Sequence, residues 1–222
     1  MQISAETIYK TLYFRSREAL HHQNIQHLRR SHSLRHGRRH SRKEERGTIN
    51  IVNGTSIHVR SRHIDNRRSL GHWERDLVSG TKNSHIATLV DRKSRYTLIL
   101  KLKGKDALSV NQALTEKFMS LPPELRQSLT WDRGIELARH QEFTSSTGVK
   151  VYFCDPQSPW QRGTNENTNG LIRQFFPKKT CLAQYTQQEL DQVAAQLNNR
   201  PRKTLKFKTP KEIIEKGVAL TS

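Results

Sequence analysis

The chain has 222 residues, room for one or two domains, and is strongly basic, with 39 Lys and Arg, 20 Asp and Glu and a formal net charge of +19. It has two cysteines, Cys154 and Cys181, which excludes a disulfide scaffold and a four-cysteine zinc site. It has no apolar run of the roughly 18–20 residues that span a bilayer and no secretory signal. We therefore expect a soluble intracellular protein with a polyanionic partner, and nucleic acid is the first candidate.

The first 28 residues predict two short helices. Ser4 is a suitable N-cap, and Ile8, Leu12 and Tyr13 follow it at helical spacing. A second helical stretch covers about 17–28. Two helices of this length are too short for an independent domain, so residues 1–28 resemble the last piece of something larger.

Residues 29–70 form a basic linker or arm in this interpretation. The densest run, 28–46, has almost no apolar residues and is expected to be extended or disordered when free. Two interpretations stay open: a solvated linker, or an arm that binds DNA phosphates and steepens the salt dependence of binding. The overall charge favours the arm, whose candidate contacts are Arg35, Arg38, Arg39, Arg42 and Lys43.

From Gly71 onward the pattern predicts a mixed α/β sheet. Strands are expected at 73–78, 85–90, 96–100, 129–131 and 149–153, where β-branched and apolar residues are dense. Helices are expected at about 106–120, 135–146 and 163–176. Three strands followed by alternating helices and strands predict one five-stranded sheet flanked by helices.

Three carboxylates lie at positions where catalytic groups are common in α/β sheets. Asp76 lies within the first expected strand, Asp132 follows the fourth, and Glu166 lies in the first turn of the last helix. Functional groups of open α/β sheets gather near the carboxyl ends of central strands. Clustered carboxylates repel one another unless hard cations such as Mg²⁺ neutralise them, and two such ions can promote phosphodiester cleavage.

The sequence around these carboxylates resembles the DDE transposases of the insertion-sequence 30 family. The resemblance rests on GHWERDL at 71–77, TWDRG at 130–134 and SPWQRGTNENTNGL at 158–171, and on the 33 residues between Asp132 and Glu166. It implies an RNase H-like catalytic domain over 71–222, and it implies Asp76, Asp132 and Glu166 as catalytic ligands of two Mg²⁺ ions, with Mn²⁺ as a substitute.

The same resemblance implies cleavage of the element's DNA ends and their transfer to target DNA. The expected partner is double-stranded DNA, bound by a homo-oligomer in the nucleoid, with neither a membrane nor a small-molecule substrate. Family members carry a helix-turn-helix region before the segment with which this chain starts, so the chain resembles a 5′-truncated copy. The alternatives are a catalytically dead remnant that only binds DNA and a stand-alone nuclease of the same fold.

Two residues depart from the family pattern beside the carboxylates. Arg75 stands where the family usually has Gly, and Arg133 where it usually has Asn. Because neighbouring side chains on a strand point to opposite faces, Arg75 is expected to pack away from Asp76. Arg133 is expected either to pair with Asp132 or to contact a phosphate.

Further DNA contacts are expected near the last helix and in the C-terminal tail. Trp160 is either a core residue or a surface on which a base stacks. Glu166, Gly170 and Arg173 share one helix face, where Gly170 would let a phosphate approach. His72 and His140 are expected to pack rather than to bind metal. The candidate contacts are Trp160, Arg162, Arg173, Lys178, Lys179, Arg202 and Lys203.

Overall fold

The computed structural model describes residues 54–132, 139–156 and 158–220. The expected helices of residues 1–28 lie outside these ranges, as does Arg133. So do the candidate arm contacts Arg35, Arg38, Arg39, Arg42 and Lys43.

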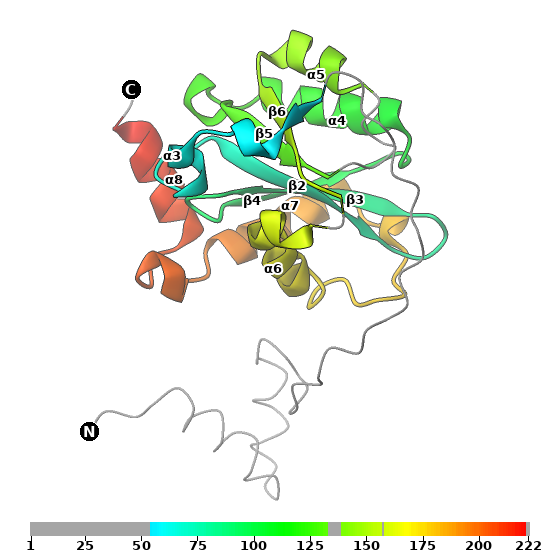
Figure 1. Cartoon of the computed structure of the whole chain (residues 1–222). Helices are drawn as coiled ribbons and strands as arrows, with labels where there is room; N and C mark the ends of the chain where they lie inside the picture. The colour runs from blue at the N-terminus through cyan, green and yellow to red at the C-terminus, as the bar shows by residue number, and fades with distance from the viewer. Residues whose placement is uncertain (1–53, 133–138, 157, 221–222) are drawn as a thin grey trace, which may run out of the picture. The chain divides into compact units, whose positions relative to one another are not determined.

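A six-stranded mixed sheet forms the centre of the described structure, in the order β1-β6-β5-β2-β3-β4 (Figure 1). The strands β2, β5, β6 and β1 run parallel, whereas β3 and β4 continue the sheet antiparallel. The bounds are β1 Thr55–Ser56, β2 His72–Ser79, β3 His85–Asp91, β4 Thr97–Lys101, β5 Ser128–Trp131 and β6 Lys150–Phe153. The five predicted strands are confirmed. The sixth, β1, has two residues and is too short to show an alternating pattern.

Helices and short 3₁₀ turns connect the strands. The α-helices are α3 Arg62–Asp65, α4 Ala107–Met119, α5 His140–Thr147, α6 Gly163–Ile172, α7 Gln187–Asn198 and α8 Pro210–Ala219. The 3₁₀ turns are η1 Ile57–Val59, η2 Pro123–Leu125, η4 Pro159–Arg162, η5 Leu182–Gln184 and η6 Lys203–Leu205. Local sequence explains several starts: Asp106 caps α4, and capping boxes begin α7 at Thr186 and α8 at Thr209.

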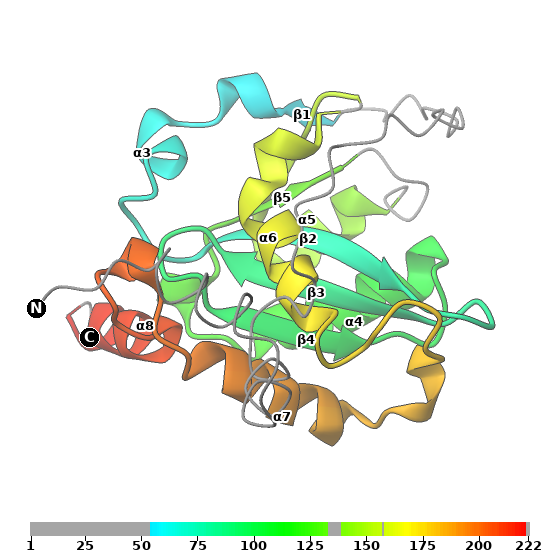
Figure 2. The same cartoon turned by 90° about the horizontal axis from the view of Figure 1, so that it is seen from below.

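The helices cover both faces of the sheet. The helices α4 and α5 lie on one face and α6 and α7 on the other, as Figures 1 and 2 show from two directions. Each face has its own apolar core. One gathers Trp73, Leu89, Phe118 and Phe143, and the other gathers residues of α6 and α7 over Ile86. The sheet is therefore the middle layer of three, and β2 and β3 contribute to both cores.

Residues 54–70 pack against this sheet, although they fall within the predicted basic linker 29–70. Thr55 and Ser56 pair with Tyr152 and Phe153 of β6. Arg60 is buried and donates to the Thr130 hydroxyl on β5 at 2.9 Å. The segment before β2 thus contributes to the sheet's edge and interior.

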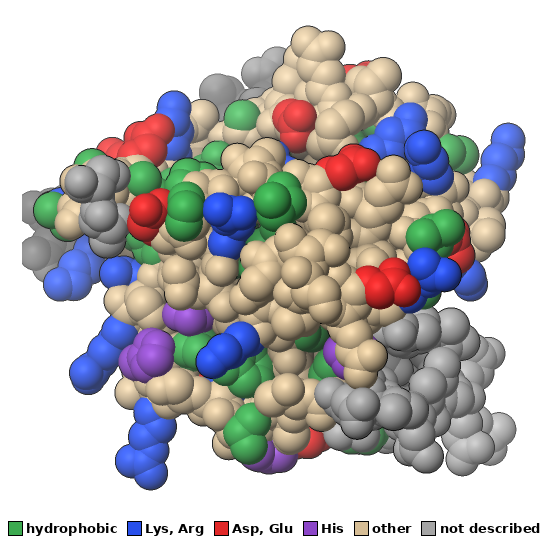
Figure 3. Space-filling view, turned by 90° about the horizontal axis from the view of Figure 1, so that it is seen from above, with side chains coloured by type: hydrophobic (Ala, Val, Ile, Leu, Met, Phe, Trp, Pro, Cys, Tyr) green, Lys and Arg blue, Asp and Glu red, His purple; other side chains and the backbone are tan. Residues whose placement is uncertain are grey.

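The surface on the α4 and α5 side is mixed in charge. Figure 3 shows Lys and Arg side chains there separated by acidic and neutral ones. In the described ranges, no helix is both long and apolar enough to span a bilayer.

Candidate active site

Asp76 and Asp132 are brought together by the pairing of β2 with β5. The two strands are parallel, and Glu74 lies opposite Thr130. Two residues further along each strand, Asp76 and Asp132 reach the same level of the sheet. Because side chains alternate along a strand, Asp76 points to the same face as Glu74. The two carboxylates, which come from different strands far apart in the sequence, therefore converge.

The guanidinium of Arg162 lies between these two carboxylates. Its Nη1 is 3.0 Å from Asp76 Oδ1, and its Nη2 donates to Asp132 Oδ2 at 3.2 Å. Nη1 also donates to the main-chain carbonyl of Arg75 at 3.0 Å. Burial acts to lower the pKa of Arg162, but the two aspartates outweigh it, so the pKa lies above its ordinary value. One buried cation thus neutralises part of the charge of the pair.

The helix α6 crosses the sheet at this point and carries Glu166 (Figure 2). Arg162 immediately precedes the helix, and Asn169 donates from Nδ2 to Asp76 Oδ2 at 3.0 Å. Positions 162, 166 and 169 have the spacing i, i+4 and i+7, which places them on one side of a helix. Glu166 therefore lies between two residues that contact Asp76, with its own side chain exposed.

A buried acidic residue fixes the start of α6. Glu74 is fully buried, and its Oε2 accepts from the main-chain nitrogen of Asn165 at 2.9 Å. The helix has no side-chain cap of its own, so Glu74 accepts one of its otherwise unpaired N–H groups, at the end where the helix dipole favours an anion. The other oxygen, Oε1, accepts from Arg92 Nη1 at 2.5 Å.

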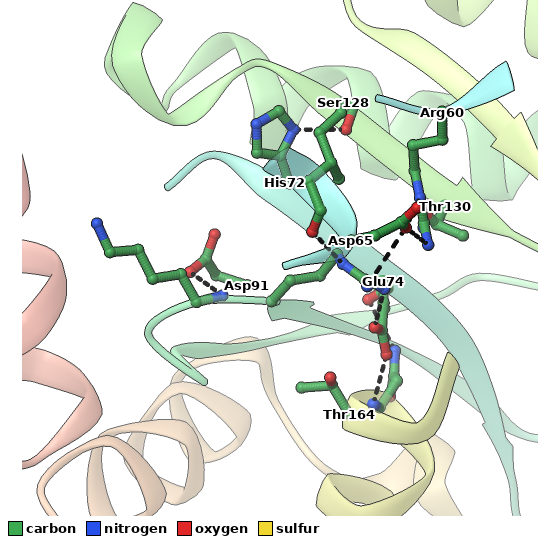
Figure 4. Close-up of polar contacts among 12 residues, drawn as sticks. Arg60, Asp65, His72, Glu74, Asp91, Ser128, Thr130 and Thr164 are labelled. Atoms are coloured by element: carbon green, nitrogen blue, oxygen red, sulfur yellow. Dashed lines mark hydrogen bonds and ion pairs between the residues drawn. The ribbon is translucent and has the colours of Figure 1, made fainter. Parts of the chain in front are cut away.

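This contact belongs to a larger polar network, which Figure 4 shows from Arg60 and Asp65 through Glu74 to the first turn of α6 near Thr164. Asp65 accepts from Arg60 and lies 3.9 Å from an Arg92 nitrogen. Buried charges are costly unless they are paired, and here each has a partner of opposite sign. The network therefore joins α3, β2 and α6 behind the carboxylate pair.

Two asparagines attach α6 to the sheet beside Asp76. The Asn165 amide donates to the carbonyls of Glu74 and Thr88 at 2.8 and 3.1 Å. The Thr88 hydroxyl lies 2.9 Å from Oδ1 of both Asn165 and Asn169. These contacts hold α6 at a fixed place over β2 and β3, and with it Glu166.

The residues beside the candidate site fall where packing requires them. Arg75 is fully buried and its guanidinium lies 4.4 Å from the centre of the Trp131 ring, on the sheet face opposite Asp76. His72 hydrogen-bonds the Ser128 hydroxyl, and His140 packs edge-on to Phe153. Arg75 therefore packs on the face away from Asp76, as expected, and both histidines pack against neighbouring residues.

The candidate DNA contacts differ in exposure. Trp160 is 72% exposed, so the interpretation of it as a core residue is wrong. Lys178, Lys179 and Lys203 are exposed. Arg173 and Arg202 are half-buried and donate to the main-chain carbonyls of Ser79 and Leu197.

Arg162 was grouped with these contacts, but its side chain is directed to the two aspartates and is only 9% exposed. Gly170 has open space around its α-carbon.

The donor set suits a hard divalent ion. Asp76 and Asp132 supply carboxylate oxygens, which Mg²⁺ prefers, and both already face a single positive group. Within residues 54–132, 139–156 and 158–220, no three His, Cys, Asp or Glu side chains lie close enough together to form a metal site. The fit therefore rests on the aspartate pair, with Glu166 on the facing helix.

Four residues of this site were not predicted from the sequence: Glu74, Arg92, Asn165 and Asn169. A signal was present for three of them: Asn165 and Asn169 have helical i, i+4 spacing around Glu166. For Glu74, the signal was its position two residues before Asp76, which places both side chains on one face. Nothing in the local sequence of Arg92 indicated its partner.

Comparisons with known proteins agree with this architecture. Residues 66–159 match the integrase core domain family model. The catalytic core domain of BIV integrase has a similar fold, with a TM-score of 0.51 and 18% identity, over 68% of this chain and 99% of that one. The sheet with its flanking helices is therefore of the RNase H-like type found in retroviral integrase cores.

Two curated relatives extend the similarity over the whole chain. The transposase InsI for insertion sequence element IS30C of Escherichia coli K12 is 88% identical over 100% of this chain and 58% of its own length. The transposase for element IS1086 of Cupriavidus metallidurans is 46% identical over 99% of this chain and 64% of its own length. The chain thus spans about three fifths of these relatives. By sequence it belongs to the insertion-sequence 30 family of transposases.

Proposed function

We propose that the protein cleaves and joins the ends of insertion-sequence DNA, with Asp76, Asp132 and Glu166 as its catalytic carboxylates. The observation that carries this proposal is the convergence of Asp76 and Asp132 on one positive group beneath the helix that bears Glu166. Family membership and the integrase-type fold support it. The alternative of a DNA-binding remnant has no separate observation in its favour.

The three carboxylates would hold two Mg²⁺ ions, or Mn²⁺ in their place. Such ions, when bound, activate an attacking oxygen and stabilise the leaving oxygen of a phosphodiester. The protein's own part is to fix the donors: β2 and β5 set the spacing of the aspartates, and Asn165 and Asn169 hold α6 over them. The supporting network contributes preorganisation rather than chemistry.

Double-stranded DNA is the proposed substrate and partner. Trp160 is exposed immediately before the candidate site and offers a surface for base stacking. Lys178, Lys179 and Lys203 are exposed cations suited to phosphate contacts, and Arg173 and Arg202 lie in the same segments. The proposal also includes assembly of two or more copies on the element ends, in the bacterial nucleoid.

The test is nicking of supercoiled plasmid with Mg²⁺ or Mn²⁺. We expect metal-dependent nicking by the wild type and its loss in Asp132→Asn. The matched control is Asp191→Asn, which removes one exposed carboxylate on α7 that accepts a hydrogen bond from Gln187. Plasmid binding at low salt without nicking would overturn the catalytic proposal and leave a DNA-binding remnant.

A further inference from the structure

Arg162 is unusual because its charge lies where a metal ion would have to bind. The side chain comes from η4, and its guanidinium bridges a carboxylate on β2 and another at the end of β5. It is buried and anchored by the Arg75 carbonyl, so it is not a mobile surface cation. Two carboxylates from adjacent strands share it.

Both carboxylate oxygens of Asp76 already have partners. Its Oδ1 lies 3.0 Å from Arg162, and its Oδ2 accepts from Asn169 at 3.0 Å. A divalent ion needs these oxygens at about 2.0–2.1 Å. At that distance the ion would also repel the guanidinium, because both are positive and the surroundings are poorly screened.

We propose that Arg162 is a resident counter-ion that competes with the divalent metal for Asp76 and Asp132. This inference rests on the proposed function, since it assumes that the two aspartates bind metal. Without metal, Arg162 holds the two carboxylates together and offsets their repulsion. For a divalent ion to bind the pair, the guanidinium would have to leave it. Arg162 lies two residues from the exposed Trp160, and the guanidinium would then donate to a DNA phosphate.

The opposite role makes the opposite prediction. If Arg162 only oriented the aspartates for metal, its loss would weaken metal binding, because the carboxylates would lose their fixed positions. If it competes, its loss strengthens metal binding, because nothing positive has to leave. The sign of the change in metal affinity therefore separates the two roles, independently of any activity.

The experiment measures Mn²⁺ affinity of the full chain by titration, with free Mn²⁺ followed by electron paramagnetic resonance. We expect Arg162→Gln to bind Mn²⁺ about tenfold more tightly than the wild type, which corresponds to about 1.4 kcal/mol. The control is Arg173→Gln, which also removes one arginine charge near α6 but whose contacts are main-chain carbonyls. Asp132→Asn identifies the part of the binding that belongs to this site.

A thermal readout keeps the test valid if Arg162→Gln folds poorly. Without metal this variant should melt at a lower temperature than the wild type, because the two carboxylates repel each other. Saturating Mn²⁺ should raise its melting temperature by more than it raises that of the wild type. In Arg162→Lys the ammonium is a single point charge that cannot bridge the two aspartates as the planar guanidinium does. The Mn²⁺ affinity of this variant should lie between those of the wild type and Arg162→Gln.

Each result of the Mn²⁺ titration either supports or overturns the proposal. Tighter Mn²⁺ binding in Arg162→Gln, and not in Arg173→Gln, supports the proposal. Unchanged or weaker binding that Asp132→Asn abolishes overturns it and leaves the proposed metal site intact. Absence of any binding sensitive to Asp132→Asn overturns both this inference and the metal-dependent function.

Discussion

The two faces of β2 are surrounded by different kinds of interaction, although the residues of the two faces alternate along one strand. Trp73, Arg75 and Leu77 lie on the side of α4 and α5, where Trp73 packs against Phe118 and Arg75 against Trp131. The other face presents carboxylates and a histidine to α6 and α3. On the first face β2 packs by apolar area, whereas on the second face matched charges and hydrogen bonds surround Glu74 and Asp76, and β2 contributes only Val78 to the apolar core there.

This difference explains how a carboxylate pair is tolerated in the middle of a sheet. The apolar face supplies burial, which stabilises the fold without regard to charge. The polar face uses directional contacts from α6, where Asn165 alone makes four hydrogen bonds to β2 and β3. Changes on the apolar face should therefore act on stability, and changes on the polar face on pairing, protonation and chemistry.

The largest expected effect is on the apolar face. Trp73→Ala removes a fully buried ring and a hydrogen bond from its Nε1 to the Leu125 carbonyl. We expect the free energy of unfolding to fall by about 3–5 kcal/mol, as measured by urea denaturation. Leu108→Ala, at a position that is 55% exposed, serves as the control and should change it by less than about 0.5 kcal/mol. Equal losses in both variants would mean that this face is not the main core.

On the polar face, charge pairing should dominate. Glu74→Gln leaves the buried Arg92 without its closest carboxylate, with only Asp65 at 3.9 Å, and should lower the free energy of unfolding by about 3 kcal/mol. Arg92→Gln should cost a similar amount. The double variant should be less destabilised than the sum of the two, because no unpaired charge remains. Strict additivity of the two losses would contradict a coupled pair.

The apolar face of β2 and the core that covers it could largely be predicted from the sequence. Runs such as 85–90 and 96–100 are rich in β-branched and apolar residues, and the stripe from Val110 to Phe118 fixes one face of α4. The order of strands also indicated that Asp76 and Asp132 would approach each other. What escaped were β1, because two residues carry no periodicity, and the helices α7 and α8, which were not among the predicted elements.

The contacts of the polar face could be predicted from the sequence only in part, because they join segments that are distant in the chain. Glu74 and Asn165 are 91 positions apart, and the contact depends on where α6 lands on the sheet. The direction of Arg162 was equally hidden, because a basic residue in a loop before a helix suits solvent or phosphate as well as a carboxylate. Its partners became evident only from the three-dimensional register of β2 and β5.

Acid should destabilise the polar face through His72. Burial, followed by the charges of His63, Arg92 and Arg60, lowers the pKa of His72 from 6.5 to about 4. Between these values the unfolded chain binds more protons than the folded one, so stability falls as pH decreases from about 6.5 to about 4. The expected loss due to His72 is about 3 kcal/mol across this window.

Comparison with His72→Gln isolates this contribution, because other groups also titrate in acid. The variant should show a shallower decrease of unfolding free energy over the same window, measured by urea denaturation at several pH values. The control is His58→Gln, because the His58 side chain is exposed and pairs with Asp155. Parallel pH profiles for the wild type and His72→Gln would show that His72 is not the group responsible.

The smallest stability effect should accompany a specific loss of chemistry. Asn169→Ala removes the amide that donates to Asp76 Oδ2 and accepts from Thr88, which should cost about 1 kcal/mol of unfolding free energy. If the polar face exists to position Asp76, the nicking rate should fall about tenfold, while plasmid binding at low salt stays unchanged. Asn167→Ala, an exposed asparagine on the same helix, should leave both unchanged. If Asn169→Ala is less stable but nicks DNA as fast as the wild type, the amide is only a packing contact. The polar face of β2 would then have no role beyond the contacts of Glu74.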